Sequence, residues 1–364
     1  MCTLKFYWSV LLEITGARCT GSSKRPSSKA AASEEARRTL RYVEPLSDAR
    51  TPLGDFFSIL PMHLAPPLLT FLFLALTAYA ATESATVSKP STKLARHLTA
   101  IAALAQAAPT VTIPAGPFSL GSTRIDDDPY GLPTQFDDTE LPQQRVWLDT
   151  FQMDRDEVSL GEFLAFLQQR NQPPPEELQK LIWHVITVHS VTDQTLARWP
   201  ALYITWQEAT DFCTSRGKRL PTESEWEKSA RGPNANLFPW GQAAPDSTLA
   251  MFGQHHVHEI PILAAVDSHN EGRSPYGIHH MAGNVAEWVQ DWFGSDYYAY
   301  VPKRNPPGPP TGRYKSVRGG SWKSKTIMLR TATRGGSPPD QRSATVGFRC
   351  AQSLTPDPNR LDMK

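Results

Sequence analysis

The feature that most limits the fold of this chain is a series of short motifs rich in Gly, Trp and Arg in its C-terminal third. They read Gly283-Asn284-Val285-Ala286-Glu287-Trp288, Asp291-Trp292, Arg318-Gly319-Gly320-Ser321-Trp322 and Gly347-Phe348-Arg349-Cys350. Turns that need Gly and cores filled by Trp favour short strands and loops over a helical bundle. The 10 Trp, 32 Pro and 22 Gly of the chain support the same interpretation.

A further motif lies upstream of this series, at residues 217–227, and reads GKRLPTESEWE. In content and order these motifs resemble the catalytic domain of formylglycine-generating enzymes, the sulfatase-modifying factors. The resemblance covers residues 110–352 and implies a single α+β domain of low regularity, related to C-type lectins. Within it, Ser159 and Thr205 stand where N-caps of helices are expected.

The N-terminal part carries an apolar segment without charge, residues 60–81, that ends on Ala78-Tyr79-Ala80. Small residues at these positions are typical of signal-peptide cleavage, here between Ala80 and Ala81. We expect translation from Met62, a signal peptide at 62–80, and a non-native or disordered extension at 1–61. The alternative is an uncleaved membrane anchor, and both alternatives export the rest of the chain to the periplasm or the exterior.

Between this segment and the domain, residues 81–109 are predicted to be a linker with one short helical period through Leu94, Leu98, Ile101 and Leu104. Residues 353–364 are predicted to be a tail. The net charge of +1, from 37 basic and 36 acidic residues, indicates no nucleic-acid partner. A membrane is a partner only if residues 60–81 are uncleaved.

Two of the four cysteines, Cys2 and Cys19, precede the apolar segment, which leaves Cys213 and Cys350 in the exported part. The resemblance implies a structural disulfide between these two, as an oxidising compartment permits. The alternative is a pair of unrelated buried thiols.

The resemblance also implies two active-site thiols for binding copper(I), because soft thiolates select that metal. They are expected between the Gly-Gly-Ser-aromatic motif and the next Arg-rich strand. Here Ser324 stands at the first position and no Cys replaces the second. We therefore expect neither copper nor copper-dependent oxidation of cysteine to formylglycine.

By the same resemblance, a peptide or small-molecule ligand is expected in a groove lined by Ser321, Trp322, Ser324, Arg330 and Arg334. The two arginines could clamp a carboxylate, and a structural salt bridge is the alternative for each.

Calcium is implied at the Gly-Asn-x-x-Glu turn, through the carbonyls of Gly283 and Val285 and the carboxylate of Glu287. His280 stands where the family has Asn or Asp, and imidazole is a poor calcium ligand. The alternative is that Glu287 accepts hydrogen bonds from the turn backbone.

A cluster of histidines, His255, His256 and His258, is a separate hint of a metal. His256 and His258 would share one face of a strand, as zinc or iron ligands do. A surface loop is the more common explanation of two imidazoles without a placed third ligand.

Three function hypotheses follow. The first is a divergent oxidoreductase or maturation factor, since proteins resembling this one occur in siderophore maturation and in sulfoxide synthases. The second is a noncatalytic ligand-binding module, because the same lectin-type scaffold carries variable binding surfaces. The third is an atypical sulfatase-activating enzyme, which the missing thiols disfavour.

Overall fold

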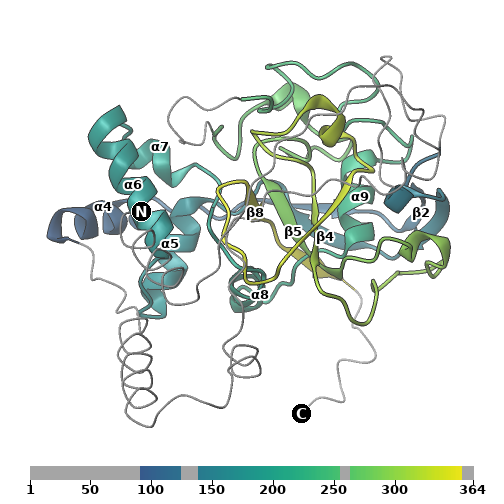
Figure 1. Cartoon of the computed structure of the whole chain (residues 1–364), viewed down its shortest axis with the longest axis horizontal. Helices are drawn as coiled ribbons and strands as arrows, with labels where there is room; N and C mark the ends of the chain where they lie inside the picture. Colours follow the sequence, from purple (N-terminus) through teal and green to yellow (C-terminus); the bar gives the residue numbers. More distant parts are fainter. Residues whose placement is uncertain (1–90, 124–137, 255–262, 355–364) are drawn as a thin grey trace, which may run out of the picture. The chain divides into compact units, whose positions relative to one another are not determined.

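The structure is a computed structural model that describes residues 91–123, 138–254 and 263–354 (Figure 1). The predicted extension at 1–61, the apolar segment 60–81 and the histidines at 255, 256 and 258 lie outside the described residues. No helix within the described ranges combines the length and the apolar character needed to cross a bilayer.

Short helices and shorter strands alternate along the described chain. The α-helices are α4 (Thr92–Ala103), α5 (Leu160–Gln169), α6 (Glu176–His189), α7 (Asp193–Ala197), α8 (Trp206–Ser215) and α9 (Glu223–Arg231). The strands are β1 (Thr110–Ile113), β2 (Gly116–Leu120), β3 (Gln144–Leu148), β4 (Phe151–Asp154), β5 (Ala286–Trp292), β6 (Lys315–Arg318), β7 (Arg334–Ser337), β8 (Val346–Phe348) and β9 (Ala351–Ser353). Single 3₁₀ turns are η2 (Asp138–Glu140), η3 (Asn270–Gly272), η4 (Tyr297–Ala299) and η5 (Thr326–Leu329).

These strands form three small sheets, with the orders β1-β4-β9, β2-β3 and β7-β6-β5-β8. All pairings are antiparallel except β5 with β8, which is parallel. Figure 1 shows β4, β5 and β8 at the centre, with α4 to α7 gathered on one side and α9 on the other. The predicted α+β fold of low regularity is confirmed.

Local capping chemistry fixes where the helices begin. Ser159 and Thr205 cap α5 and α8 as predicted, and each is part of a full capping box with the Glu three residues later. Thr222 caps α9 in the same way. In each box the cap side chain and the Glu side chain satisfy backbone N–H groups that the helix leaves free.

Helix α4 corrects one expectation. Its residues Leu94, Leu98 and Ile101 are buried in the largest core cluster, and the helix packs against α5. The segment predicted as a linker therefore contributes to the core, and the folded part includes α4 instead of starting at residue 110. The predicted helical period is correct for Leu94, Leu98 and Ile101. Leu104 is the C-cap of the helix and is exposed.

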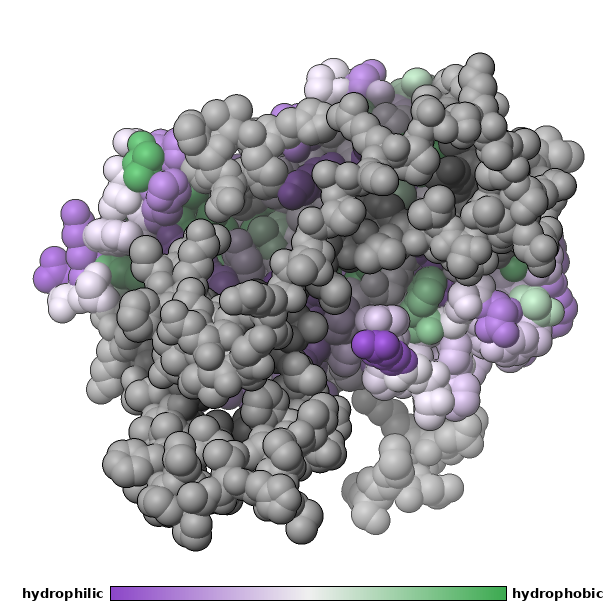
Figure 2. Space-filling view, in the orientation of Figure 1, coloured by the Kyte–Doolittle hydropathy of each residue, from purple (hydrophilic) through white to green (hydrophobic). Residues whose placement is uncertain are grey.

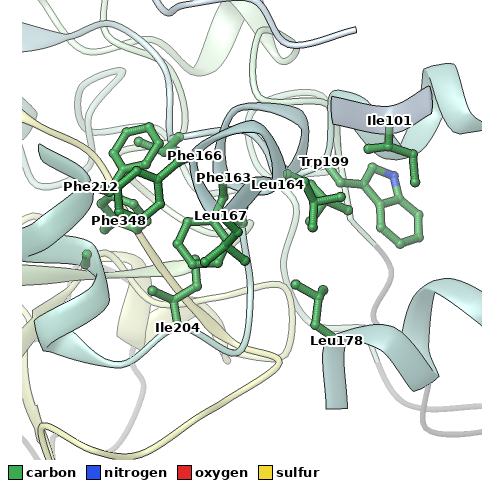
Figure 3. Packing of buried hydrophobic residues seen from close by; sticks show 14 of the residues in the cluster. Ile101, Phe163, Leu164, Phe166, Leu167, Leu178, Trp199, Ile204, Phe212 and Phe348 are labelled. Atoms are coloured by element: carbon green, nitrogen blue, oxygen red, sulfur yellow. The ribbon is translucent and has the colours of Figure 1, made fainter. Parts of the chain in front are cut away.

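The core that joins the helices to the sheet combines aliphatic side chains with a group of phenylalanines (Figure 3). Phe212 of α8 and Phe348 of β8 meet edge to face with ring centroids 5.3 Å apart, and Phe163 of α5 lies 6.4 Å from both. Such geometry is favoured by the ring quadrupoles and adds to the burial of large apolar area. On the face shown in Figure 2, hydrophobic residues appear as small separate patches among hydrophilic ones.

Candidate functional site

Two glycines that no other residue could replace without strain directly precede the predicted groove segment. Gly319 and Gly320 have φ of +92° and +69°, in the left-handed region that favours glycine. A Cβ on Gly320 would lie 2.8 Å from the carbonyl oxygen of Met328, and one on Gly319 3.0 Å from the Trp226 ring. The Gly-Gly pair thus bends the chain from β6 towards Ser321 while letting it touch the core.

Ser321 and Ser324 then close a tight turn on themselves. The Ser321 backbone N–H donates to Ser324 Oγ at 2.9 Å, and the Ser324 N–H donates to the Ser321 carbonyl at 2.9 Å. The Lys323 N–H donates to Ser321 Oγ at 3.3 Å. The hydroxyl that stands at the expected thiol position therefore stabilises the turn, and Lys323 is the residue that the turn exposes.

Trp322 lies inside the domain instead of on a groove surface. Its indole N–H donates to the carbonyl of Ala344 at 2.9 Å, and its backbone N–H donates to the carbonyl of Asn284 at 2.7 Å. The side chain is buried, so its position matches the core role that large aromatics have elsewhere in this chain.

Arg330 and Arg334 are both engaged with internal carboxylates. Arg330 Nη2 donates to Glu140 at 2.7 Å, and Arg334 holds Glu223 through two bonds of 2.7 and 2.8 Å. The Arg334 guanidinium also stacks 4.0 Å from the ring centroid of Tyr298. Burial pushes the pKa of Glu223 upwards, but the Arg334 charge and hydrogen bonds leave it below its usual value. Both arginines therefore form internal salt bridges, which was the alternative to a carboxylate clamp.

Glu287 is a fully buried acceptor at the start of β5. Its two oxygens accept from Arg349 Nε at 2.8 Å and Nη2 at 2.6 Å, and one also accepts from the Trp226 indole at 2.9 Å. The remaining Arg349 donors reach the carbonyls of Asp154, Arg155 and His279. Side chains thus satisfy Glu287, and Arg349 balances its charge.

This arrangement fits calcium poorly. An ion at Gly283, Val285 and Glu287 would compete with the Arg349 guanidinium for the only carboxylate of the set. His280 presents a neutral imidazole, whose Nε2 lies 3.0 Å from the carbonyl of Ala265. Burial, with a smaller effect of His269, lowers the pKa of His280 to about 3. Calcium binding here stays a prediction.

A second group of buried polar residues lies beside the Glu287–Arg349 pair, and the sequence does not point to it. His279 Nδ1 lies 2.6 Å from Asp156, and its Nε2 lies 3.1 Å from the side-chain oxygen of Asn270. The carboxylate of Glu157 accepts from the Asn284 side chain at 2.7 Å. In the contacts of His279 with Asp156 and of Asn284 with Glu157, the partners are more than 100 positions apart, so no spacing in the sequence reveals them. The local signal is the acidic pair Asp156-Glu157, which follows β4 after Arg155.

The disulfide between Cys213 and Cys350 is confirmed. It joins α8 to the segment between β8 and β9, across a sequence separation of 137, with Cα atoms 5.5 Å apart. Both cysteines of the described residues are used in this bond.

Within residues 91–123, 138–254 and 263–354, no three His, Cys, Asp or Glu side chains are arranged to hold a metal ion. His255, His256 and His258 lie outside those ranges, so their metal site stays a prediction.

Comparison with known proteins identifies the family. The sequence profile described as "Sulfatase-modifying factor enzyme 1-like domain" matches residues 97–354. The chain belongs to the sulfatase-modifying factor family. The matched range takes in part of α4, in agreement with the packing of that helix against the sulfatase-modifying factor domain.

Two relatives in sequence and one solved structure are similar to this chain. The formylglycine-generating enzyme of Bos taurus is 32% identical over 294 residues, covering 68% of this chain and 75% of that protein. The hercynine oxygenase of Mycolicibacterium smegmatis is 30% identical over 269 residues, covering 66% of this chain and 60% of that protein. The structure of PvdO from Pseudomonas aeruginosa aligns with a TM-score of 0.49 at 22% identity, covering 67% of this chain and 94% of that one.

Proposed function

We propose that this chain is an exported sulfatase-modifying factor relative that does not oxidise cysteine to formylglycine with copper. It acts instead on a peptide or small molecule at the surface of the Ser321–Ser324 turn, as a divergent oxidoreductase or maturation factor. Export in this proposal depends on residues 60–81, whether they are cleaved or kept as an anchor.

The observation that supports this proposal most is the use of Cys213 and Cys350 in one disulfide. Copper(I) binding needs thiolates, and a disulfide sulfur is not one. At the turn itself, Ser324 Oγ accepts a hydrogen bond from the Ser321 backbone. A serine hydroxyl neither selects copper(I) nor exchanges disulfides.

Similarity to a hercynine oxygenase supports an oxidoreductase, because that relative shares the domain and is named for a different oxidation. The alternative is a noncatalytic binding module. The internal ion pairs of Arg330 and Arg334 favour this alternative, since they leave Lys323, Lys325 and Met328 as the exposed groups of the segment. Such a surface can hold a ligand without a built catalytic group.

A direct assay tests the proposal. The full chain is incubated with a cysteine-containing sulfatase peptide, copper(I) and oxygen, and the peptide is followed by mass spectrometry, with the Bos taurus enzyme as positive control. We expect an unchanged cysteine. Formylglycine formed at a rate similar to the control would refute the proposal and restore the atypical sulfatase-activating enzyme.

The metal content of the same preparation separates the two remaining functions. Stoichiometric iron or zinc together with oxygen consumption supports the oxidoreductase. Ligand binding without turnover, in metal-loaded and metal-free protein alike, supports the binding module.

A further inference from the structure

The segment that carries the Ser321–Ser324 turn is strongly basic. Residues 297–339 contain no Asp or Glu but nine basic residues, which are Lys303, Arg304, Arg313, Lys315, Arg318, Lys323, Lys325, Arg330 and Arg334. Since a buried charge needs a partner, each of these side chains either contacts groups from elsewhere in the chain or stays at the surface.

The structure gives most of these residues a partner. Four arginines pair with carboxylates of other segments, as Arg304–Asp149, Arg318–Glu227, Arg330–Glu140 and Arg334–Glu223. Three more contact a side-chain oxygen or an aromatic ring, namely Lys303, Arg313 and Lys315. Within the described ranges, the ammonium groups of Lys323 and Lys325 have no ion pair, hydrogen bond or ring contact, and both residues are exposed. Two positive charges without a partner in these ranges therefore lie two positions apart.

Hydrogen bonds hold the backbone around both lysines. The Lys323 N–H is bonded within the turn, and the Lys325 carbonyl accepts from the Met328 N–H at 2.9 Å. Between them, the Ser324 carbonyl accepts from the Gly253 N–H at 2.9 Å. Because the backbone is already ordered, binding of a ligand by the two lysines orders only their side chains.

An apolar surface adjoins the lysines. Met328, in η5, is 42% exposed, and Phe252 is half-buried against the core cluster that contains Leu329. Gly253 has a φ of +64°, and no atom of the described residues lies within 4 Å of the place where its Cβ would be. The surface beside the turn is therefore open at Gly253.

We propose that this surface, formed by Phe252, Gly253, Lys323, Lys325 and Met328, binds an acidic peptide segment in extended form. The peptide places carboxylates at alternate positions against the two lysines and an apolar side chain against Met328. Alternate side chains of an extended strand lie on one face about 7 Å apart, which two lysines at positions i and i+2 can both reach. The inference rests on the proposed function, since it names the ligand class at the Ser321–Ser324 turn.

The composition of this surface favours a peptide over other anionic partners. Anionic membranes attract clusters of about four to eight basic residues, and nucleic acids attract a basic stripe on a domain of high pI. Here two lysines stand in a chain whose net charge is +1. An acidic peptide needs no more than two such contacts, and its apolar side chain meets the flexible thioether of Met328.

The test is fluorescence anisotropy of three labelled peptides titrated with the full chain. The Glu peptide reads Ser-Gly-Glu-Val-Glu-Leu-Gly-Ser, and the Gln and Lys peptides have Gln or Lys in place of both Glu residues. We expect the Glu peptide to bind about tenfold more tightly than the Gln peptide, and the Lys peptide to bind most weakly. High salt should remove this difference, because it screens exposed charges. No binding of the Glu peptide, or equal binding of the Glu and Gln peptides, overturns the proposal.

Variants of the two lysines assign the contact. Lys323→Gln and Lys325→Gln should each weaken the Glu peptide by about threefold and leave the Gln peptide unchanged. Reversal of both charges, by Lys323→Glu together with Lys325→Glu, should transfer the preference to the Lys peptide. Both side chains are exposed and the turn is held by backbone and serine groups, so these variants keep the fold. A reversed variant that does not prefer the Lys peptide would contradict direct contact.

The matched control is Lys93→Gln, an exposed lysine at the start of α4 that does not belong to this surface. It should leave all three affinities unchanged. A loss equal to that of Lys323→Gln would show a general effect of surface charge and overturn the assignment.

Two further outcomes separate this proposal from its neighbours. Phosphatidylserine vesicles that bind more tightly than the Glu peptide, and are released by the reversed variant, would replace the peptide by an anionic membrane and refute the assignment. Formylglycine formation would refute the proposed function without changing these affinities, whereas equal binding of the Glu and Gln peptides would refute the ligand class alone.

Discussion

Glu287→Gln is the substitution that tests most directly how this domain is held together. Glu287 and Arg349 have no exposed side-chain surface, and the pair is joined by bonds of 2.8 and 2.6 Å. Glutamine has the shape of glutamate, so the substitution opens no cavity. It removes the charge that balances Arg349 and turns one acceptor oxygen into an NH₂ group that faces N–H donors.

The expected loss can be estimated in two ways. Breaking a buried pair by removing one partner costs about 3–5 kcal/mol, because the other charge stays buried without compensation. The two hydrogen bonds from Arg349 are charge-assisted, at about 1.5–3 kcal/mol each, which gives a similar sum. For a domain of this size, such a loss lowers Tm by roughly 2–4 °C per kcal/mol, or about 6–20 °C in total.

Urea unfolding of the oxidised protein, followed by far-UV circular dichroism, measures this loss as a lower midpoint at unchanged slope. The matched control is Glu176→Gln, which breaks the exposed pair of Glu176 with Lys180 on α6. This control should leave the unfolding midpoint nearly unchanged, because solvent screens an exposed pair. A loss below about 1 kcal/mol for Glu287→Gln would show that Arg349 finds another partner, and the reasoning would fail.

Three further predictions concern acid stability, the disulfide and α4. Because the pKa of His280 lies at about 3 in the folded protein, below its unfolded value, its contribution to stability is full above pH 6.5 and falls as pH drops towards 3. His280→Asn, which suits the left-handed φ of +52°, should therefore remove about 2–3 kcal/mol of the stability difference between pH 7.5 and 4.5 in paired urea titrations. Replacing Cys213 and Cys350 together by Ala should cost roughly 5 kcal/mol in the same assay, from the 137-residue separation, and a loss below about 1 kcal/mol would contradict the chain-entropy account. Leu98→Ala should cost about 2–5 kcal/mol because Leu98 is buried, whereas Leu104→Ala, at an exposed position, should cost under about 1 kcal/mol; similar losses in the two would mean that α4 is not part of the core.

The features predicted correctly depend on few neighbouring residues or on motifs of the family. Ser159 and Thr205 begin helices because a hydroxyl and a Glu three positions later satisfy free N–H groups, which is a local property. The bridge between Cys213 and Cys350 followed from family resemblance and the expected compartment.

The features missed depend on partners far apart in sequence. Arg330 meets Glu140 across 190 positions, and Arg349 meets Glu287 across 62. An arginine that clamps a ligand and one that holds an internal carboxylate have the same local sequence. The sequence predicts a linker at α4 because the apolar repeat there covers only one short helical stretch. The burial of α4 depends on the complementary face of α5, which lies far along the chain.

The three-stranded sheet has a consequence for the order in which the chain can fold. Its middle strand, β4, pairs with β1 near the start of the domain and with β9 at the end of the described chain. A ribosome delivers β1 and β4 long before β9, and Cys350, which bonds Cys213, is delivered immediately before β9. One edge of β4 therefore stays unpaired until β9 has been made, and a truncated chain that ends before Ala351 leaves that edge open. Completion of the domain is an event of its last residues, since the three-stranded sheet lacks one strand until then.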